Sequence, residues 1–154
     1  MTTVRCDDID TLSNFVSDDY GDWGPEVEIT QAMVNRFADM TNDHQWIHVD
    51  VERAKDGPFG GTIVHGFFLL ALLPRYRAPL PFGVEGETSR VDYGAESYRF
   101  LAPVRVGSTV HARSRLAGVR AHAQGTLLAQ HDLVSVVGAD RPSLSYTGLL
   151  LYKH

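Results

Sequence analysis

The stretch Gly61–Tyr76, "GTIVHGFFLLALLPRY", contains the longest apolar run of the chain, from Gly66 to Leu73. If this run is helical, its own side chains are apolar around the whole circumference, which is typical of a helix enclosed by protein. The run is far shorter than the roughly 18 residues of a membrane span, so no span is expected. Pro74 would close or kink the last turn. We expect a central helix over about Gly66–Tyr76, which needs a wide sheet or a partner subunit to cover it.

The chain after this helix has the pattern of β-strands. Polar and apolar residues alternate in Tyr98 and Phe100, and again in Leu127, Ala129 and Leu133. Turn residues separate three strand-rich segments, Thr88–Val119, His122–Gly138 and Pro142–Tyr152. One buried helix followed by several strands predicts an α+β protein, with an antiparallel sheet packed on the helix. With no linker in the sequence, residues 1–154 are expected to form a single domain.

The chain before the central helix is expected to carry a short strand and a helix. Val27–Ile29 is the strand candidate, and Thr30 is suited to cap a helix over Gln31–Met40. That helix leads into the polar stretch Asp39–Asp50, "DMTNDHQWIHVD". Arg75 and Arg77, near the end of the central helix, are expected to cap its C-terminus.

Composition excludes several classes of function. The chain is 44% hydrophobic and 21% charged, with a formal net charge of −5. Its 14 lysines and arginines are scattered, which argues against nucleic-acid binding. Cys6 is the only cysteine, so neither an intrachain disulfide nor a thiolate metal cluster is possible. Because the first residues lack an apolar signal core, we expect a cytoplasmic protein.

The stretch Asp39–Asp50 has the spacing of a zinc site. His44 and His48 would share one face of a helix, as the zinc ligands of helical peptidases do. Such a peptidase also needs a glutamate as general base, and Gln45 stands where it would be. The residues between and after the two histidines are poor helix formers. We therefore expect no metal site here.

An acid–base pair is the second interpretation of the same stretch. On a helix Asp43 and His48 would point about 140° apart, so they converge only if the chain turns between them. A carboxylate beside an imidazole raises its basicity, and the two together can bind and polarise one water. The alternative is a surface loop with a solvated histidine.

The segment "GGTIVHGF" that opens the central helix adds context. A glycine-rich turn before an apolar helix presents free N–H groups at the positive end of the helix dipole. Gly66 would let a ligand approach the backbone, so its N–H is a candidate oxyanion donor. For His65 we favour a structural role, in which its ring satisfies a buried carbonyl.

Together these segments resemble the MaoC-like hydratases, which include the (R)-specific enoyl-CoA hydratases. The matching runs are "TNDHQWIHVDVERA" and "PFGGTIVHGF". The family signature is an Asp, four residues, a His, and then an Ile-x-His-Gly that opens a long helix. Asp43, His48 and Gly66 occupy those places with the same spacing.

A further segment extends the resemblance. Tyr98–Leu116 looks like the family's aromatic strand leading into a Pro-Val-x-x-Gly turn. The match is closer still to the nodulation-protein-N-like branch, which carries a "DYG" like Asp92–Gly94. The resemblance covers roughly Val27–Leu116.

The resemblance implies a fold and a chemistry. The fold is a hotdog, an antiparallel sheet wrapped around the helix Gly66–Tyr76, and such domains pair as homodimers with sites near the interface. The reaction is reversible hydration of a trans-2-enoyl thioester, on CoA or acyl carrier protein, to a (3R)-hydroxyacyl thioester. Asp43 and His48 would hold the water, while the N–H of Gly66 polarises the thioester carbonyl. No cofactor is expected.

The chain departs from the commonest family pattern, Gly-Asp-x-Asn-Pro-x-His, at three places. Asn42 replaces the glycine, Gln45 the asparagine and Trp46 the proline. Gln45 keeps an amide that would support the loop or the water, and Trp46 adds bulk that would shape the acyl pocket. The candidate substrate-binding residues are Gln45, Trp46, Gly61, His65 and Tyr93.

Two other functions remain open. A hotdog thioesterase would use a carboxylate to activate water on the carbonyl and release free CoA. A non-catalytic subunit would bind acyl thioesters without turnover, because a fold does not guarantee chemistry.

Overall fold

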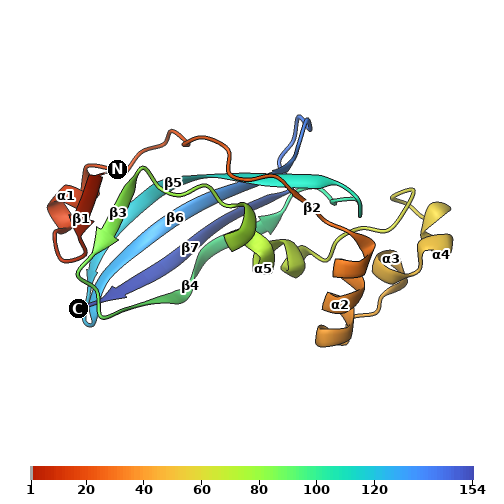
Figure 1. The fold of residues 1–154 in the computed structure, drawn as a ribbon, viewed down its shortest axis with the longest axis horizontal. Coiled ribbons are helices and arrows are strands. Elements are labelled where there is room, and N and C mark those ends of the chain that lie inside the picture. Colours follow the sequence, from red (N-terminus) through yellow and green to blue (C-terminus); the bar gives the residue numbers. More distant parts are fainter. Residues whose placement is uncertain (1) are drawn as a thin grey trace.

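The structure is a computed structural model that describes residues 2–154. Its main feature is a five-stranded sheet in the order β2-β5-β6-β7-β4 (Figure 1). All neighbouring strands in this sheet run antiparallel. The strands are β2 (Val27–Glu28), β4 (Ser89–Phe100), β5 (Thr109–His122), β6 (Gly125–Val136) and β7 (Leu144–Lys153).

Helix α5 spans Gly66–Tyr76 and packs on one face of this sheet, which we call the inner face. It begins where the apolar run begins, and its bounds are those that the family resemblance implies. The core that it forms with the inner face consists of buried apolar side chains, chiefly Val34, Val64, Phe68, Leu69, Leu73, Tyr76, Val104, Val110, Ala112, Val134 and Leu144. Burial of these side chains is the main energy that holds the helix against the sheet. None of the described helices is long and apolar enough to cross a membrane.

A smaller unit at the N-terminus was not anticipated from the sequence. Strand β1 (Thr2–Arg5) pairs in parallel with β3 (Phe82–Glu85), and α1 (Ile9–Ser13) follows β1. A second buried cluster, centred on Leu12, Phe82 and Leu128, joins this unit to the far end of the main sheet. These elements are short, and their pairing partners are far apart in the chain, so local periodicity carries little signal for them.

Three helices form an excursion between β2 and α5, beyond one end of the sheet (Figure 1). They are α2 (Gln31–Thr41), α3 (Trp46–Val49) and α4 (Val51–Lys55). The hydroxyl of Thr30 caps α2 by accepting a hydrogen bond from the N–H of Met33, as predicted. The helix ends at Asn42, whose φ of 58° is left-handed. Asparagine is the residue after glycine that best tolerates this conformation, which explains Asn42 at a family glycine position.

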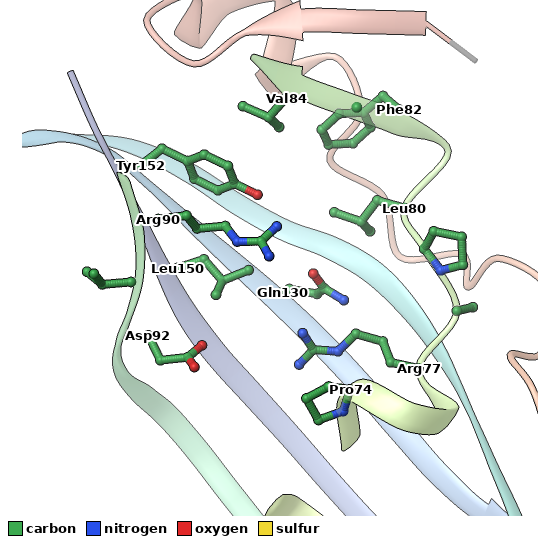
Figure 2. Close-up of a pocket in the computed structure, with 14 residues that line it drawn as sticks. Pro74, Arg77, Leu80, Phe82, Val84, Arg90, Asp92, Gln130, Leu150 and Tyr152 are labelled. Atoms are coloured by element: carbon green, nitrogen blue, oxygen red, sulfur yellow. The ribbon is translucent and has the colours of Figure 1, made fainter. Parts of the chain in front are cut away.

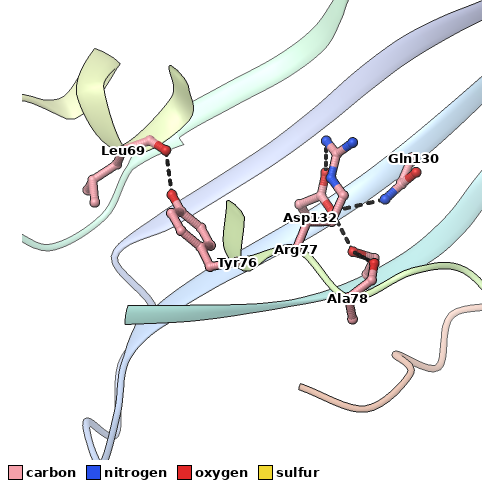
Figure 3. A network of polar contacts seen from close by, with 7 residues as sticks. Leu69, Tyr76, Arg77, Ala78, Gln130 and Asp132 are labelled. Carbon is pink, nitrogen blue, oxygen red and sulfur yellow. Dashed lines mark hydrogen bonds and ion pairs between the residues drawn. The ribbon is translucent and has the colours of Figure 1, made fainter. Parts of the chain in front are cut away.

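A buried ion pair fastens the end of α5 to the sheet (Figure 3). The guanidinium of Arg77 donates to the carboxylate of Asp132 at 2.7 Å, and Asp132 is fully buried. Ser114 and Gln130 also donate to Asp132. The expected capping role of Arg77 is therefore wrong, because its side chain turns away from the helix end toward a buried charge.

The substitution Arg77→Met tests this ion pair. Burial raises the pKa of Asp132, and Arg77 opposes that effect. Without Arg77 we expect the free energy of unfolding at pH 8 to fall by about 3 kcal/mol, since a buried carboxylate loses its cation. A raised folded-state pKa favours folding as pH falls, so the deficit should be smaller at pH 5 than at pH 8, because a larger share of Asp132 is then protonated. Urea unfolding at both pH values measures this.

Arg75→Met is the matched control, because Arg75 is exposed two residues earlier on the same helix. It should change stability little at either pH. A loss in Arg77→Met that is the same at pH 8 and pH 5 would show that the pair is not the cause.

Candidate functional site

The catalytic loop predicted from the sequence lies between α2 and α3. Asp43, His44 and Gln45 form no regular structure, and α3 then makes a single turn that contains His48. This turn forms although its residues are poor helix formers, because tertiary contacts hold it. The N–H of Ile63 donates to the carbonyl of Ile47, and a side-chain amide donates to the carbonyl of His48.

His48 is held in one tautomer. Its side chain is buried, and Nδ1 lies 2.7 Å from the carbonyl oxygen of Ile63. A carbonyl only accepts hydrogen bonds, so Nδ1 carries the proton and Nε2 presents a lone pair. Burial lowers the pKa of His48 below its ordinary value of 6.5, and the neighbouring His65 lowers it further. The imidazole is therefore neutral at pH 7 and able to accept a proton at Nε2.

His65 joins the two catalytic candidates to each other. Its ring stacks on His48 at 3.8 Å between centroids, and it is only 3% exposed. Its Nε2 donates to the backbone carbonyl of Asp43 at 3.0 Å and lies 3.9 Å from the Asp43 carboxylate. The expectation that His65 satisfies a buried carbonyl matches this geometry, and the carbonyl is that of Asp43 itself.

Asp43 and His48 come together as the acid–base interpretation requires. One side-chain oxygen or nitrogen from each of Asp43, His48 and His65 lies within 4.8 Å of the others. That separation suits one bridging water held by two hydrogen bonds. The Asp43 side chain is 54% exposed, so water reaches the pair from the solvent side.

The same three residues are the group best placed to hold a metal ion. However, the nitrogen of His65 nearest to the Asp43 carboxylate is Nε2, which carries the proton donated to the Asp43 carbonyl. Lone pairs remain on the Asp43 carboxylate, on Nε2 of His48 and on Nδ1 of His65, a buried atom without a hydrogen-bond partner in residues 2–154.

Gly66 opens helix α5 beside this pair. No backbone hydrogen bond from its N–H is found within residues 2–154, so the N–H is free at the positive end of the helix dipole. A Cβ at this position would lie 2.8 Å from the ring of Phe100. Any larger residue at this position would have to push the Phe100 ring aside, so glycine fits this close approach.

An apolar cavity of about 340 Å³ lies beside these groups. His48 and Gly66 both line it, and Asp43 lies outside its lining. The rest of the lining is almost entirely apolar: Phe59, Ile63, Val64, Phe67, Leu69, Phe100, Leu101, Ala102, Pro103, Val104 and Ser143. A cavity of this kind suits an aliphatic chain attached to a polar reacting group.

The remaining predicted residues lie around the loop or away from it. His44 pairs with Asp39 at 2.8 Å on the surface, so it does not join His48 as the zinc spacing would require. Gln45 is exposed and begins α3. Trp46 packs on Gly57 and under the guanidinium of Arg53. The contacts of Trp46 make it part of the loop's structure, and the backbone carbonyl of Gln45 accepts a hydrogen bond from the N–H of His48.

Gly61 and Tyr93 are not brought to the cavity. Gly61 has a φ of 157°, and a Cβ there would meet the guanidinium of Arg105. Tyr93 lies in a bulge of β4 and contacts His122. Along the strand it is roughly 20 Å from Phe100. Neither residue lines the cavity that holds His48.

One residue that supports the backbone of His48 was not predicted from the sequence. The side chain of Gln31 donates to the carbonyl of His48 at 2.8 Å and accepts from the hydroxyl of Thr62 at 2.7 Å. It therefore ties the start of α2 to both segments of the site. A glutamine in the first turn of a helix has no distinctive local pattern, so only the tertiary contact identifies it.

The sequence matches a family model and several known proteins. Residues 21–137 match the family model described as "MaoC like domain". A 3-hydroxyacyl-thioester dehydratase Z of Mycobacterium tuberculosis is 48% identical over 132 residues, which cover 85% of each chain. Nodulation protein N of Rhizobium meliloti is 40% identical over 129 residues, covering 77% of this chain and 75% of that one.

Solved structures agree on the fold. An (R)-hydratase from A. caviae involved in PHA biosynthesis superposes with a TM-score of 0.68 at 23% identity, covering 88% of this chain and 97% of that one. The predicted hotdog fold is therefore confirmed.

These matches define the class of the protein, which is an enzyme of the hydratase or dehydratase type. The chain belongs to the family of MaoC-like domains.

The contact between Gly66 and Phe100 can be tested by Gly66→Ala. The added Cβ meets the Phe100 ring, so we expect a loss of about 1–3 kcal/mol in unfolding free energy from overpacking. Phe100 is 40% exposed, and its truncation should cost less than that of a core residue. The double variant Gly66→Ala/Phe100→Ala should therefore be more stable than the sum of the single losses predicts, as measured by urea unfolding. Additive losses would show that the ring is not the obstacle.

Proposed function

We propose that this enzyme adds water to trans-2-enoyl thioesters and gives (3R)-hydroxyacyl thioesters, or catalyses the reverse dehydration. One observation carries the proposal. A carboxylate oxygen of Asp43 and a ring nitrogen of His48 lie within 4.8 Å of each other, which one water can bridge, and His48 lines an apolar cavity together with Gly66. The relative named 3-hydroxyacyl-thioester dehydratase Z supports this substrate class.

In the hydration direction His48 acts as the base. Its Nε2 takes a proton from the bridging water as the water oxygen bonds to C3 of the enoyl group. The electrons of the double bond move toward the thioester, and His48 then returns the proton to C2. Asp43 accepts a hydrogen bond from the second O–H of the water and stays ionised. One water is thus added, and no proton or electron is left over.

The negative charge of the intermediate collects on the thioester oxygen. The free N–H of Gly66 donates to that oxygen, and the dipole of α5 favours the charge. The helix start is rigid because Phe68 and Leu69 already donate to the carbonyl of His65. A donor that is fixed before the reaction costs no reorganisation when charge develops.

The acyl chain would occupy the apolar cavity that His48 and Gly66 line. The carrier of the thioester is CoA or an acyl carrier protein, and no cofactor takes part in the scheme. A homodimer and a cytoplasmic location complete the proposal. Strand β4 is an exposed edge that pairs only with β7 among residues 2–154, which supports the dimer.

Replacing either member of the catalytic pair tests the proposal. Asp43→Asn and His48→Ala should each lower the turnover of crotonyl-CoA hydration by about 10²–10⁴-fold, as expected for loss of an acid–base group. The assay follows loss of enoyl absorbance with the purified, folded variants. Asp39→Asn and His44→Ala are matched controls, because this exposed pair lies nearby and outside the cavity; both should retain activity.

Wild-type turnover in both catalytic variants would overturn the assignment. Release of free CoA from saturated acyl-CoA, trapped with a thiol reagent, would favour the thioesterase instead. Tight acyl-CoA binding without turnover across chain lengths would favour a binding subunit.

The pH dependence tests the role of His48. Because burial lowers its pKa below 6.5, His48 stays neutral through pH 7 and is protonated only in more acidic solution. We expect kcat/KM for hydration to be flat near neutrality and to fall as pH decreases through that lowered pKa. Asp43 raises the pKa of His48, so Asp43→Asn should shift the acid limb to still lower pH. An acid limb above pH 6.5 would contradict a neutral, buried base.

A further inference from the structure

A second cavity lies apart from the one that His48 and Gly66 line. Its volume is about 510 Å³, and it lies between the inner face of the main sheet and the segment that joins α5 to β3 (Figure 2). No residue lines both cavities. We call this one the arginine cavity, because two arginines line it.

Hydrogen-bond donors from several segments converge in the arginine cavity. Figure 2 shows the guanidinium groups of Arg77 and Arg90 directed into it from opposite sides, with the amide of Gln130 between them. The hydroxyl of Tyr152 points into the same space. Gln130 and Tyr152 are each only 5% exposed, so these two groups are held away from bulk water. A cluster in which donors outnumber acceptors suits an anion.

The protein itself balances the charge of Arg77 but not that of Arg90. Arg77 donates to the buried carboxylate of Asp132 at 2.7 Å, and the amide of Gln130 also donates to Asp132. The Nε of Arg77 is buried and has no partner in residues 2–154, so some of its donors stay unused. Arg90 has no ion-pair partner in the same residues, and its guanidinium lies 6.0 Å from the centroid of the Tyr152 ring. The cavity therefore presents one positive charge without a counter-ion.

Asp92 is a carboxylate at the border of this cavity. It lies two residues from Arg90 along β4, a distance of about 7 Å. It also lines a neighbouring cavity beside α5, together with Phe67 and Leu70. Because Asp92 is exposed, water and salt screen its charge. Asp92 therefore weakens the attraction of the arginine cavity for an anion without cancelling it.

Apolar side chains form the wall beside the donors. Leu80, Phe82 and Leu150 line the cavity, and Figure 2 shows Leu80 and Phe82 across the space from Tyr152. A few polar groups in an otherwise apolar wall fix the polar end of an amphipathic ligand. A phosphate, with about two negative charges, would leave its second charge without a cation. A monocarboxylate needs only the charge that Arg90 offers.

We propose that the arginine cavity binds an organic carboxylate that carries an aliphatic chain. The planar carboxylate matches the fork of Arg90, which donates two parallel hydrogen bonds to it. The hydroxyl of Tyr152 donates to the same carboxylate, and the chain lies on Leu80 and Phe82. Arg90 and Pro79 at the rim are exposed, so the ligand enters from solvent. The site does not depend on the proposed hydration of enoyl thioesters, because it shares no residue with the catalytic cavity.

Octanoate is the probe, and isothermal titration calorimetry measures its binding to the purified enzyme. We expect Arg90→Met to weaken binding about 10–100-fold, as for loss of a hydrogen bond from a charged group. Tyr152→Phe keeps the buried ring and removes only the hydroxyl, so it should weaken binding about three- to tenfold. Arg99→Met is the matched control, because Arg99 lies on the same strand outside the cavity. It should change binding less than about twofold.

The sign of the charge is tested by Asp92→Asn and by analogues of the probe. Removal of the Asp92 carboxylate should strengthen octanoate binding about two- to fivefold, because a like charge near the ligand is lost. Octanol has the chain without the charge, and inorganic phosphate has charge without the chain. Both should therefore bind at least about tenfold more weakly than octanoate.

Any of four results would overturn the proposal. The first is no binding of octanoate to the wild-type enzyme. The second is equal binding to the wild type and Arg90→Met, which would place octanoate in the cavity of His48 and Gly66. The third is tighter binding of octylamine than of octanoate, because Asp92 would then be the main contact. The fourth is displacement of octanoate by free CoA, because the arginine cavity would then belong to the thioester substrate.

Discussion

The structure of the site depends on how the segment before α5 is clamped. Thr62, Ile63 and Val64 carry no regular structure of their own beyond a single bridge, yet their backbone groups bond on both sides. The N–H of Ile63 donates to the carbonyl of Ile47 in α3, and the N–H of Val64 donates to the carbonyl of Val104. The carbonyl of Thr62 accepts a hydrogen bond from the N–H of Val106. The carbonyl of Ile63 in turn accepts a hydrogen bond from Nδ1–H of His48. One short segment therefore sets the place of the helix start, the tautomer of the base and the position of the loop.

The two stacked histidines are held in place by hydrogen bonds to backbone carbonyls. Each imidazole has one nitrogen against a backbone carbonyl, so each spends its single proton in a structural bond. Burial and the neighbouring His65 ring lower the pKa of His48, which favours its neutral form. The Asp43 side chain remains on the solvent side, where water is available. Burial therefore distinguishes a buried imidazole from an exposed carboxylate beside it.

The two edges of the main sheet differ, because one is covered and the other is exposed. The N-terminal segment protects β5, whereas β4 exposes its backbone beside the aromatic cluster of Phe67, Tyr98 and Phe100. Phe100 lies where a side chain at Gly66 would be, and it lines the cavity that holds His48, so the exposed edge and this cavity are parts of one surface.

Local patterns were enough for the elements that periodicity and capping govern. The apolar run predicted the start of α5, and Thr30 marked the start of α2. The long strands after the helix followed from alternation, and the spacing of Asp43, His48 and Gly66 pointed to one site before any fold was known. The parallel pair β1–β3 was missed, because pairing between distant short segments leaves no local trace.

The sequence by itself determined which chemical groups are available and in which order, because side-chain identity and spacing are local properties. Only the tertiary structure decided what each group does there. It turned Arg77 from a helix cap into the counter-ion of a buried carboxylate, since Asp132 lies far along the chain. In the folded chain the ring of His65 donates to the carbonyl of Asp43, and the side chain of Gln31 donates to the carbonyl of His48. Such contacts join residues that are distant in sequence, so they depend on the burial and hydrogen-bond geometry of the folded chain.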